Sequence, residues 1–170
     1  AIALACNPAL LIADEPTTAL DVTIQAQVLE LMRDLKQQFD SAMILISHDI
    51  GVVAEICDSV AIMYAGRIVE KADAAALYDR PLHPYTQGLF SSIPDLTKEM
   101  KRLHTIPGLP PDPTNLPDGC CFAPRCCLAD DTCRAHSPEM REFAPGHFVA
   151  CFKAGSKIIQ DDAGTEAVQP

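Results

Sequence analysis

The stretch LLIADEPTTALD, from Leu10 to Asp21, decides how the first part of this chain folds. An apolar run ends there in two adjacent carboxylates, Asp14 and Glu15, and Pro16 follows at once. Carboxylates are rarely buried in proteins unless they are paired or bound to a metal ion. We therefore interpret the run as a buried strand that carries two acidic groups to its carboxyl end, where they can hold a charged ligand.

Two short apolar runs predict neighbouring parallel strands. The runs ALLIA, 9–13, and AMILIS, 42–47, are continuous rather than alternating, which is typical of strands buried on both faces of a parallel sheet. Between them Asp21 can cap a helix, because apolar residues recur at spacings of three and four beyond it. The positions expected on the buried face of this helix are Ile24, Val28, Leu31, Leu35 and Phe39.

The next segment continues the alternation of strands and helices. A second helix is expected from about Asp49 to Ile56, directly after the second strand. SVAIMY and RIVEK flank Ala65 and Gly66, which predicts a β-hairpin whose glycine takes a positive φ. ADAAALY, 72–78, predicts a further short helix. This order of elements indicates an α/β fold with a parallel-sheet core.

Composition excludes several classes of protein. The chain has 170 residues, with 13 basic against 23 acidic side chains and a net charge of -10, so nothing in its charge supports binding to nucleic acid. No apolar run approaches the roughly 20 residues of a membrane-spanning helix, and no charged-then-apolar leader is present. Because the chain starts at Ala1 within a helix-like phrase and without Met, we expect it to be a piece of a longer protein.

Cysteine and proline set the second part of the chain apart from the first. Six of the eight cysteines fall between Cys120 and Cys151, and without a secretory context they are not expected to form disulfides. Cys6 and Cys57 lie in apolar contexts and are interpreted as buried thiols. The segment 94–117 holds six prolines, so it is expected to be an extended strap without regular structure.

The carboxyl ends of the two predicted strands bring candidate functional groups to one edge of the sheet. Ligands of α/β sheets gather at this edge, and it holds Asp14, Glu15 and the triplet Ser47-His48-Asp49. A carboxylate there suits Mg²⁺, which prefers oxygen ligands. A second carboxylate suits a general base that orients water, and a histidine suits contact with a phosphate oxygen. Taken alone, the acidic pair also fits a helix cap or a solvated turn, but the flanking PTTALD and SHD favour the functional interpretation.

These motifs, in this order and spacing over residues 1–71, resemble the second half of the nucleotide-binding subunit of ABC transporters. LLIADEP resembles the Walker B strand, TTALD the D-loop, and ILISHD the strand that enters the H-loop. The resemblance implies that Asp14 holds Mg²⁺ through its water shell and that Glu15 polarises the attacking water. It further implies that His48 contacts the γ-phosphate of ATP and that Asp21 bridges to the partner ATPase subunit.

A second set of motifs narrows the resemblance. HPYT, 83–86, followed by the proline-rich strap and the cysteines, resembles the peptide and nickel importer branch of the family. In that branch LPDGCCFAPRCCLADDTC resembles the cluster motif, whose last cysteine lies in a GHxVAC phrase, here GHFVAC. We expect four segments: an ATPase portion, 1–80; the HPYT segment and strap, 81–117; a small irregular cysteine-rich iron–sulfur module, 118–152; and a flexible tail, 153–170.

The resemblance implies a [4Fe-4S] cluster held by four cysteines. These are Cys120, Cys126, Cys133 and Cys151. The C-x₂₋₄-C spacing common in structural zinc sites is absent from this set, but spacing discriminates weakly, and zinc is the alternative metal. Cys121 and Cys127 stand where prolines are common in the family. A residue next to a ligand seldom reaches the same metal, so we interpret both as spectators, although a ligand set that uses Cys121 and Cys127 stays open.

The other histidines and the tyrosines receive structural interpretations. His83 is expected to pack the HPY turn, and His136 and His147 are interpreted as surface loop residues rather than metal ligands. The tyrosines interpreted as core or rim aromatics are Tyr64, Tyr78 and Tyr85.

Two nucleotide-binding motifs are missing from the sequence. It contains no G-x-x-x-x-G-K-[ST] loop and no LSGGQ-like signature, so the chain alone is expected neither to cradle the phosphates of ATP nor to hydrolyse it. The full-length parent is expected to be an ATPase that energises the import of di- or oligopeptides or nickel. The alternatives are a stand-alone iron–sulfur or zinc interaction module and an ABC-type ATPase outside transport.

The resemblance also implies partners and a location. A second ATPase subunit, identical or different, would pair with this one, and transmembrane permease subunits would carry the substrate. A substrate-binding protein would act indirectly, and it selects the substrate together with the permease. A subunit of this kind lies peripherally on the cytoplasmic face of the cell's inner membrane.

Overall fold

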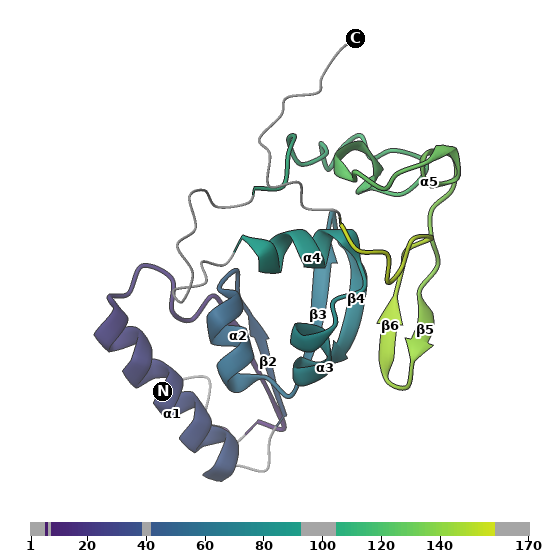
Figure 1. The fold of residues 1–170 in the computed structure, drawn as a ribbon. Coiled ribbons are helices and arrows are strands. Elements are labelled where there is room, and N and C mark those ends of the chain that lie inside the picture. The colour runs from purple at the N-terminus through teal and green to yellow at the C-terminus, as the bar shows by residue number, and fades with distance from the viewer. Residues whose placement is uncertain (1–5, 7, 39–41, 93–104, 159–170) are drawn as a thin grey trace, which may run out of the picture. The chain divides into compact units, whose positions relative to one another are not determined.

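The computed structural model describes residues 6, 8–38, 42–92 and 105–158 of the chain (Figure 1). The chain divides into two compact units, residues 1–60 and 61–170. Each unit has a core of its own. Residues 61–80, which the sequence groups with the ATPase portion, thereby share a unit with the cysteine-rich segment.

The first unit is built on two parallel strands. β1 (Leu10–Asp14) pairs in parallel with β2 (Ala42–Ile46). Helix α1 (Val22–Gln38) connects the two strands, and helix α2 (Ile50–Ile56) follows the second. Parallel strands need a crossover connection of this kind, and the order of strand, helix, strand and helix predicted from the sequence is confirmed.

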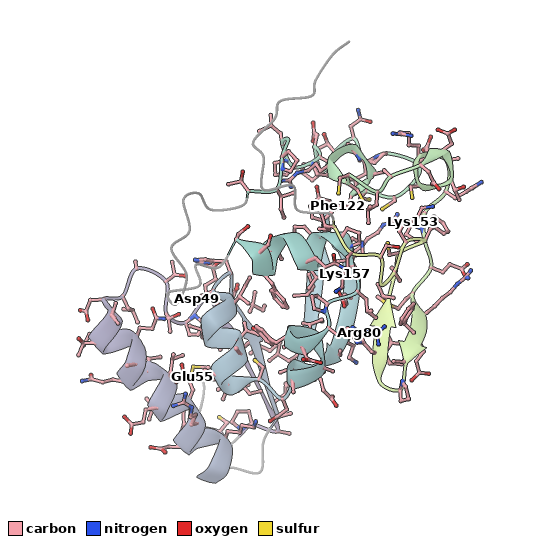
Figure 2. All side chains as sticks on the ribbon, viewed as in Figure 1. Asp49, Glu55, Arg80, Phe122, Lys153 and Lys157 are labelled. Atoms are coloured by element: carbon pink, nitrogen blue, oxygen red, sulfur yellow. The ribbon has the colours of Figure 1, made fainter. Side chains whose placement is uncertain are left out.

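Both helices of the first unit begin at an aspartate cap. Asp21 Oδ1 accepts hydrogen bonds from the backbone N–H groups of Thr23 at 3.0 Å and Ile24 at 2.9 Å. Asp49 Oδ1 accepts one from Gly51 at 2.9 Å at the start of α2, where Figure 2 labels it. A cap of this kind contributes about 1 kcal/mol to helix stability. The prediction that Asp21 caps the first helix is confirmed.

The core of the first unit lies between its helices and one face of its sheet. The buried side chains are Leu29, Met32 and Val52. The stripe predicted for α1 is confirmed at Val28, which packs against this core, but it is wrong at Ile24 and Leu31, which are 41% and 56% exposed. The helix turns Leu29 and Met32 inward because these side chains pack with Val52 of α2. The last position of the predicted stripe, Phe39, lies outside the described residues.

The opposite face of β1 and β2 is left uncovered by the part of the chain that the structure describes. Among the described residues, packing is confined to the face toward α1 and α2, so the prediction that these strands are buried on both faces is wrong within this part of the chain. The exposed fractions are 46% for Leu10, 60% for Ile12, 48% for Ile44 and 48% for Ile46. A contiguous apolar patch of this kind is typical of an interaction surface.

The second unit contains a four-stranded sheet in the order β3-β4-β6-β5. β3 (Ser59–Tyr64), within which the division between the units falls, and β4 (Arg67–Asp73) form the predicted hairpin. Its turn has φ of 48° at Ala65 and 75° at Gly66. Positive φ at both central residues is the geometry of the type I′ turn that matches strand twist, so the hairpin prediction is confirmed.

The cysteine-rich segment contributes the other two strands of this sheet. β5 (Arg141–Ala144) and β6 (His147–Val149) pair antiparallel, and β6 also pairs antiparallel with β4. The segment further contains the 3₁₀ turn η2 (Ala123–Arg125) and the short helix α5 (Asp131–Ala135). The module expected to be irregular therefore has strands that extend the hairpin sheet, a feature not foreseen from the sequence.

Two helices follow the hairpin. α3 (Ala74–Asp79) starts two residues later than predicted, because Ala72 and Asp73 still belong to β4. α4 (Pro84–Ser91) starts within HPYT, with proline at its first position, where a missing N–H costs no hydrogen bond.

The proline-rich strap is described only in part. Residues 105–117 form neither helix nor strand, as predicted, whereas residues 93–104 and the tail from 159 onward lie outside the described residues. None of the described helices is long and apolar enough to cross a membrane.

Aromatic side chains form the centre of the second unit. Tyr64 and Phe122 meet edge to face with ring centroids 5.3 Å apart, and Tyr85 lies 4.7 Å from Tyr64. Such pairs add about 0.5–1.5 kcal/mol beyond their buried area. Tyr78 stacks on Phe90 at 4.7 Å, so all three tyrosines pack as predicted.

A fully buried carboxylate, that of Glu70 on β4, joins three segments of the second unit. Its Oε1 accepts hydrogen bonds from the Leu82 N–H at 2.7 Å and from Nε2 of His147 at 2.7 Å. Its Oε2 accepts one from the His83 N–H at 2.9 Å. A buried carboxylate is tolerated only when its oxygens are satisfied in this way. Glu70 therefore fixes the turn before α4 and strand β6 against β4.

Two predictions about single residues are wrong. His147 is only 5% exposed, because it lies on β6 and pairs with Glu70, so it is not a surface loop residue. His136 is exposed, as predicted. Cys6 is exposed rather than buried, while Cys57 is half-buried, and its burial raises the pKa of its thiol.

Replacing Glu70 tests this arrangement. We expect Glu70→Ala to lower the free energy of unfolding by about 3 kcal/mol or more, because a buried histidine and two backbone amides lose their acceptor. All three tyrosines lie in the second unit and the chain has no tryptophan, so urea unfolding followed by tyrosine fluorescence reports on this unit. The exposed Glu139→Ala is the matched control, expected to stay within about 0.5 kcal/mol of the unsubstituted chain. Equal stability of the two variants would contradict the bridging role of Glu70.

Candidate functional site

The carboxyl ends of β1 and β2 carry the first candidate site. Asp14 ends β1 opposite Ile46, the last residue of β2. The Glu15 N–H then donates to the Ile46 carbonyl at 2.9 Å, which keeps the two chain segments together beyond the strands. The parallel register thus places Glu15 beside His48, as the common edge of two parallel strands requires.

Glu15 and His48 form a direct pair. Nδ1 of His48 lies 3.1 Å from Glu15 Oε1, and Thr18 Oγ1 donates to Glu15 Oε2 at 2.9 Å. Both hydrogen bonds lower the pKa of the Glu15 carboxyl below its usual range, and the one from His48 has the larger effect. Glu15 is therefore an ionised, exposed carboxylate at neutral pH, and such a group can orient and polarise a water molecule by accepting a hydrogen bond from it.

The loop after β1 holds two residues in an uncommon backbone conformation. Glu15 has φ of 45° and Ala19 has φ of 62°, both in the left-handed region. For residues with a side chain this conformation costs roughly 1–2 kcal/mol and is concentrated at functional sites. One of these two strained residues, Glu15, is the residue that pairs with His48.

Asp14 and Asp21, the other two residues predicted for this site, do not take part in the pair of Glu15 and His48. Asp14 is exposed at the end of β1, on the same sheet face as Ile12. Asp21 is also exposed, and its Oδ1 is engaged in the cap of α1. Ser47 Oγ accepts the N–H of Asp49 at 3.0 Å and so shapes the turn that presents His48.

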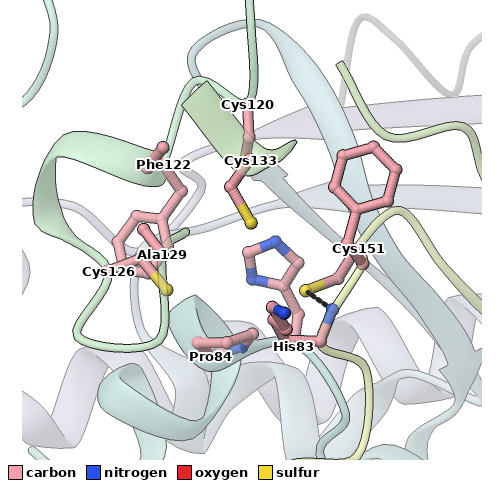
Figure 3. Close-up of a pocket in the computed structure, with 11 residues that line it drawn as sticks. His83, Pro84, Cys120, Phe122, Cys126, Ala129, Cys133 and Cys151 are labelled. Carbon is pink, nitrogen blue, oxygen red and sulfur yellow. Dashed lines mark hydrogen bonds between the residues drawn. The ribbon is translucent and has the colours of Figure 1, made fainter. Parts of the chain in front are cut away.

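The second candidate site is a pocket in the second unit lined by cysteines (Figure 3). The four predicted ligands all contribute to its wall, and they are Cys120, Cys126, Cys133 and Cys151. Cys133 comes from α5, Cys126 follows η2, and Cys151 follows β6 by two residues. His83 and Pro84, at the start of α4, also line this pocket.

Backbone hydrogen bonds hold the cysteine loops in place. The Cys120 N–H donates to the Cys133 carbonyl at 2.8 Å. Gly119 before it has no room for a side chain, because a Cβ there would lie 2.5 Å from the same carbonyl oxygen. The Lys153 N–H donates to Cys151 Sγ at 3.2 Å, the bond drawn in Figure 3.

An ion pair links the two loops that carry Cys133 and Cys151. Asp130 Oδ1 caps α5 by accepting the Cys133 N–H at 3.0 Å, and Asp130 Oδ2 binds Lys153 Nζ at 2.5 Å (Figure 2 labels Lys153). The lysine holds the pKa of the Asp130 carboxyl well below its usual range, and the carboxylate raises the pKa of Lys153. Both groups are therefore charged at neutral pH, and their ion pair holds the two loops together.

Burial keeps three thiols of this pocket, those of Cys120, Cys126 and Cys151, protonated when nothing is bound. It raises the pKa of Cys120 and Cys126, and it raises the pKa of Cys151 to about 12. Only a cation that takes up the thiolate charge would reverse these shifts. As the side chains stand, no group of three or more His, Cys, Asp or Glu residues in the described ranges is arranged to hold a metal ion.

The two cysteines interpreted as spectators lie elsewhere. Cys121 is buried in the aromatic core with Tyr64 and Phe122. Cys127 is exposed. Neither is among the residues that line the pocket.

His83, which the sequence predicts to be a structural residue of the HPY turn, also lines the cysteine pocket and is a further functional candidate. It is 1% exposed, and burial lowers the pKa of its imidazole to about 4. Its Nδ1 accepts the Tyr85 N–H at 3.0 Å and so caps α4, whereas its Nε2 has no hydrogen-bond partner within the described residues. The proline at the first helical position signals the cap, but no sequence pattern signals the unpartnered nitrogen.

Known proteins resemble this chain over nearly its whole length. A family model described as the oligopeptide/dipeptide transporter, C-terminal region, matches residues 69–133. Oligopeptide transport ATP-binding protein AppD of Bacillus subtilis is 57% identical over 89% of this chain and 46% of its own length. Oligopeptide transport ATP-binding protein OppD of Salmonella typhimurium is 50% identical over 94% of this chain and 47% of its own. The chain thus spans about half the length of the curated relatives that it matches.

A solved structure, cbiO1 of Clostridium perfringens, from the ABC transporter complex cbiONQ, is 29% identical over 42% of this chain and 29% of its own. Its TM-score of 0.40 is too low to support a statement about the fold. Over most of its length the chain is thus similar to ATP-binding proteins of oligopeptide transport, and part of it matches the C-terminal region of the oligopeptide/dipeptide transporter family.

Proposed function

We propose that this chain is the carboxyl-terminal portion of an ATPase subunit that energises the import of di- or oligopeptides. The observation that carries the proposal is the Glu15–His48 pair at 3.1 Å, at the carboxyl ends of two parallel strands. The similarity to oligopeptide transport ATP-binding proteins supports the same conclusion. The alternatives are a stand-alone metal module and an ABC-type ATPase outside transport.

The residues at the carboxyl ends of β1 and β2 would each have a separate role in ATP hydrolysis. Glu15, ionised and oriented by His48 and Thr18, would take a proton from the attacking water and align it with the γ-phosphate. His48, exposed at the turn after β2, would contact a γ-phosphate oxygen through the ring nitrogen that does not face Glu15. Mg²⁺, which supplies charge neutralisation to the phosphates, would be held through water at Asp14.

The partners of the whole protein are part of this proposal. A second ATPase subunit, identical or different, would meet the loop that ends at Asp21, and transmembrane permease subunits would bind the assembled pair. A substrate-binding protein would deliver the peptide. The assembly places the subunit peripherally on the cytoplasmic face of the inner membrane. The apolar sheet face of Ile12 and Ile44 suits burial by the remainder of the longer protein.

We further propose a [4Fe-4S] cluster on Cys120, Cys126, Cys133 and Cys151. Three observations support it: the four cysteines line one pocket, burial raises the pKa of Cys120, Cys126 and Cys151, and the same pocket is lined by His83, whose buried Nε2 has no partner in the described part of the chain. A four-iron cluster binds each thiolate to a different iron, so its ligands surround a pocket. A single Zn²⁺ would need all four sulfurs about 2.3 Å from one point, which makes zinc the weaker alternative.

Replacing Glu15 in the full-length protein tests the catalytic proposal. Glu15→Gln keeps the size of the side chain but removes the charge that orients water, so we expect ATP binding to persist while steady-state hydrolysis falls about 100-fold or more. Glu30→Gln, on the exposed face of α1, is the matched control and should hydrolyse ATP at the normal rate. A Glu15→Gln enzyme within a few-fold of that rate would remove Glu15 from the catalytic role.

The cluster is tested by colour and metal content after anaerobic purification. We expect a brown chain with about four iron atoms and four sulfides, the composition of a [4Fe-4S] cluster. Serine at Cys120, Cys126, Cys133 or Cys151 should each bleach it, because each substitution removes a ligand.

Cys127→Ser, at an exposed position next to a proposed ligand, is the matched control and should keep the colour. A colourless chain with about one zinc would favour the alternative metal. Bleaching by Cys127→Ser with Cys126 dispensable would move the ligand set to the neighbouring cysteines.

A further inference from the structure

The unpartnered nitrogen of His83 stands out among the polar atoms of the second unit. Its Nε2 is buried without a hydrogen-bond partner in the described part of the chain, and the side chain is only 1% exposed. Leaving such a group unsatisfied costs about 1–3 kcal/mol, so native structures rarely tolerate it. Thr86 Oγ1 is also unpartnered, but only His83 lines the cysteine pocket.

The hydrogen bond on the other side of the ring fixes which nitrogen carries the proton. Nδ1 of His83 accepts the Tyr85 N–H at 3.0 Å. A nitrogen that accepts a hydrogen bond cannot carry a proton, so the ring is neutral and its hydrogen is on Nε2. The same reasoning excludes the imidazolium, in which both nitrogens are donors.

The position of the ring directs this donor toward the cysteines. Figure 3 shows the imidazole of His83 among the sulfur atoms of Cys126, Cys133 and Cys151, all of which line the same pocket. The backbone on the opposite side is also fixed, because the His83 N–H donates to the buried Glu70 Oε2 at 2.9 Å. The side chain is therefore held by its cap and by its own amide, with the Nε2–H left for the pocket.

We propose that His83 donates its Nε2–H to a sulfur of the cluster at Cys120, Cys126, Cys133 and Cys151, and thereby raises the cluster's reduction potential. The inference rests on the proposed iron–sulfur cluster. It assigns His83 as a positioning and tuning residue and not as a ligand, because a nitrogen that carries a hydrogen has no lone pair for iron. Hydrogen bonds to cluster sulfurs stabilise the more negative, reduced state, and so shift the potential upward.

Two substitutions separate the donor from the cap. His83→Asn keeps an oxygen close to the position of Nδ1, where it can still cap α4, but has no group that reaches the position of Nε2. His83→Gln places an amide N–H near the position of Nε2 but is a poor cap. A role confined to capping would make His83→Gln the more damaging change, whereas a hydrogen bond to the cluster makes His83→Asn the one that alters the potential.

The midpoint potential of the anaerobically purified chain is the main readout, measured by titration with redox mediators. We expect His83→Asn to make reduction about tenfold less favourable, equivalent to a fall of about 59 mV for one electron. His83→Gln should stay close to the unsubstituted protein. An unchanged midpoint in His83→Asn would overturn the proposal. Loss of the cluster from a folded His83→Asn chain would overturn it too, because it would make His83 a ligand.

A measurement on the unsubstituted chain covers the case in which a variant does not fold. Resonance Raman spectra in H₂O and D₂O should show iron–sulfur stretching bands that shift on deuteration, since a hydrogen-bonded sulfur feels the exchanged proton. Bands insensitive to D₂O would overturn the proposal, while absence of any cluster from the unsubstituted chain would instead refute the proposed iron–sulfur site.

Discussion

The carboxylate of Glu70 is the constraint on which the second unit depends. It is fully buried and satisfied by three donors: the amides of Leu82 and His83, and the imidazole of His147. In a medium of low dielectric constant, a charge of this kind stabilises the fold only while every partner stays in place. The turn before α4 and strand β6 are therefore both fixed to β4. If either one shifted, the buried carboxylate would lose a hydrogen-bond donor.

The same carboxylate fixes two parts of the wall of the cysteine pocket. Glu70 lies opposite Val149 in the pairing of β4 with β6, and the Ala150 N–H donates to the Val69 carbonyl at 2.9 Å. These contacts fix the backbone directly before Cys151, and so they fix where Cys151 lies in the pocket wall. His83 is set by the same group, through its backbone N–H. One buried interaction thus places both a proposed ligand and the donor that faces the ligands. In the first unit, by contrast, Glu15 is exposed, and its ionised form is favoured by hydrogen bonds from His48 and Thr18.

Local signals in the sequence predicted the local structure well. The apolar runs, the Asp21 cap and the Ala65-Gly66 turn each depend on neighbouring residues, and all three are present. The acidic pair and His48 could be placed at one sheet edge because parallel strands share their carboxyl ends. The predicted stripe of α1 is only partly right, because the side chains that face inward depend on contact with Val52, which no pattern within the helix indicates.

What depends on distant contacts could not be predicted. Glu70 and His147 are 77 residues apart, so nothing near either residue indicates that they form a buried pair. The same applies to the joining of β6 to β4, and to the Nε2 of His83, whose significance depends on a pocket assembled from three later loops.

A double-mutant cycle on Glu70 and His147 tests the central role of this pair most directly. The unfolding free energies of Glu70→Ala, His147→Ala and the double variant would be measured by tyrosine fluorescence in urea. We expect a coupling energy of about 1 kcal/mol or more, because the second substitution removes a partner that the first has already lost. Single effects that add to within about 0.3 kcal/mol would contradict it, since the two residues would then stabilise the fold independently.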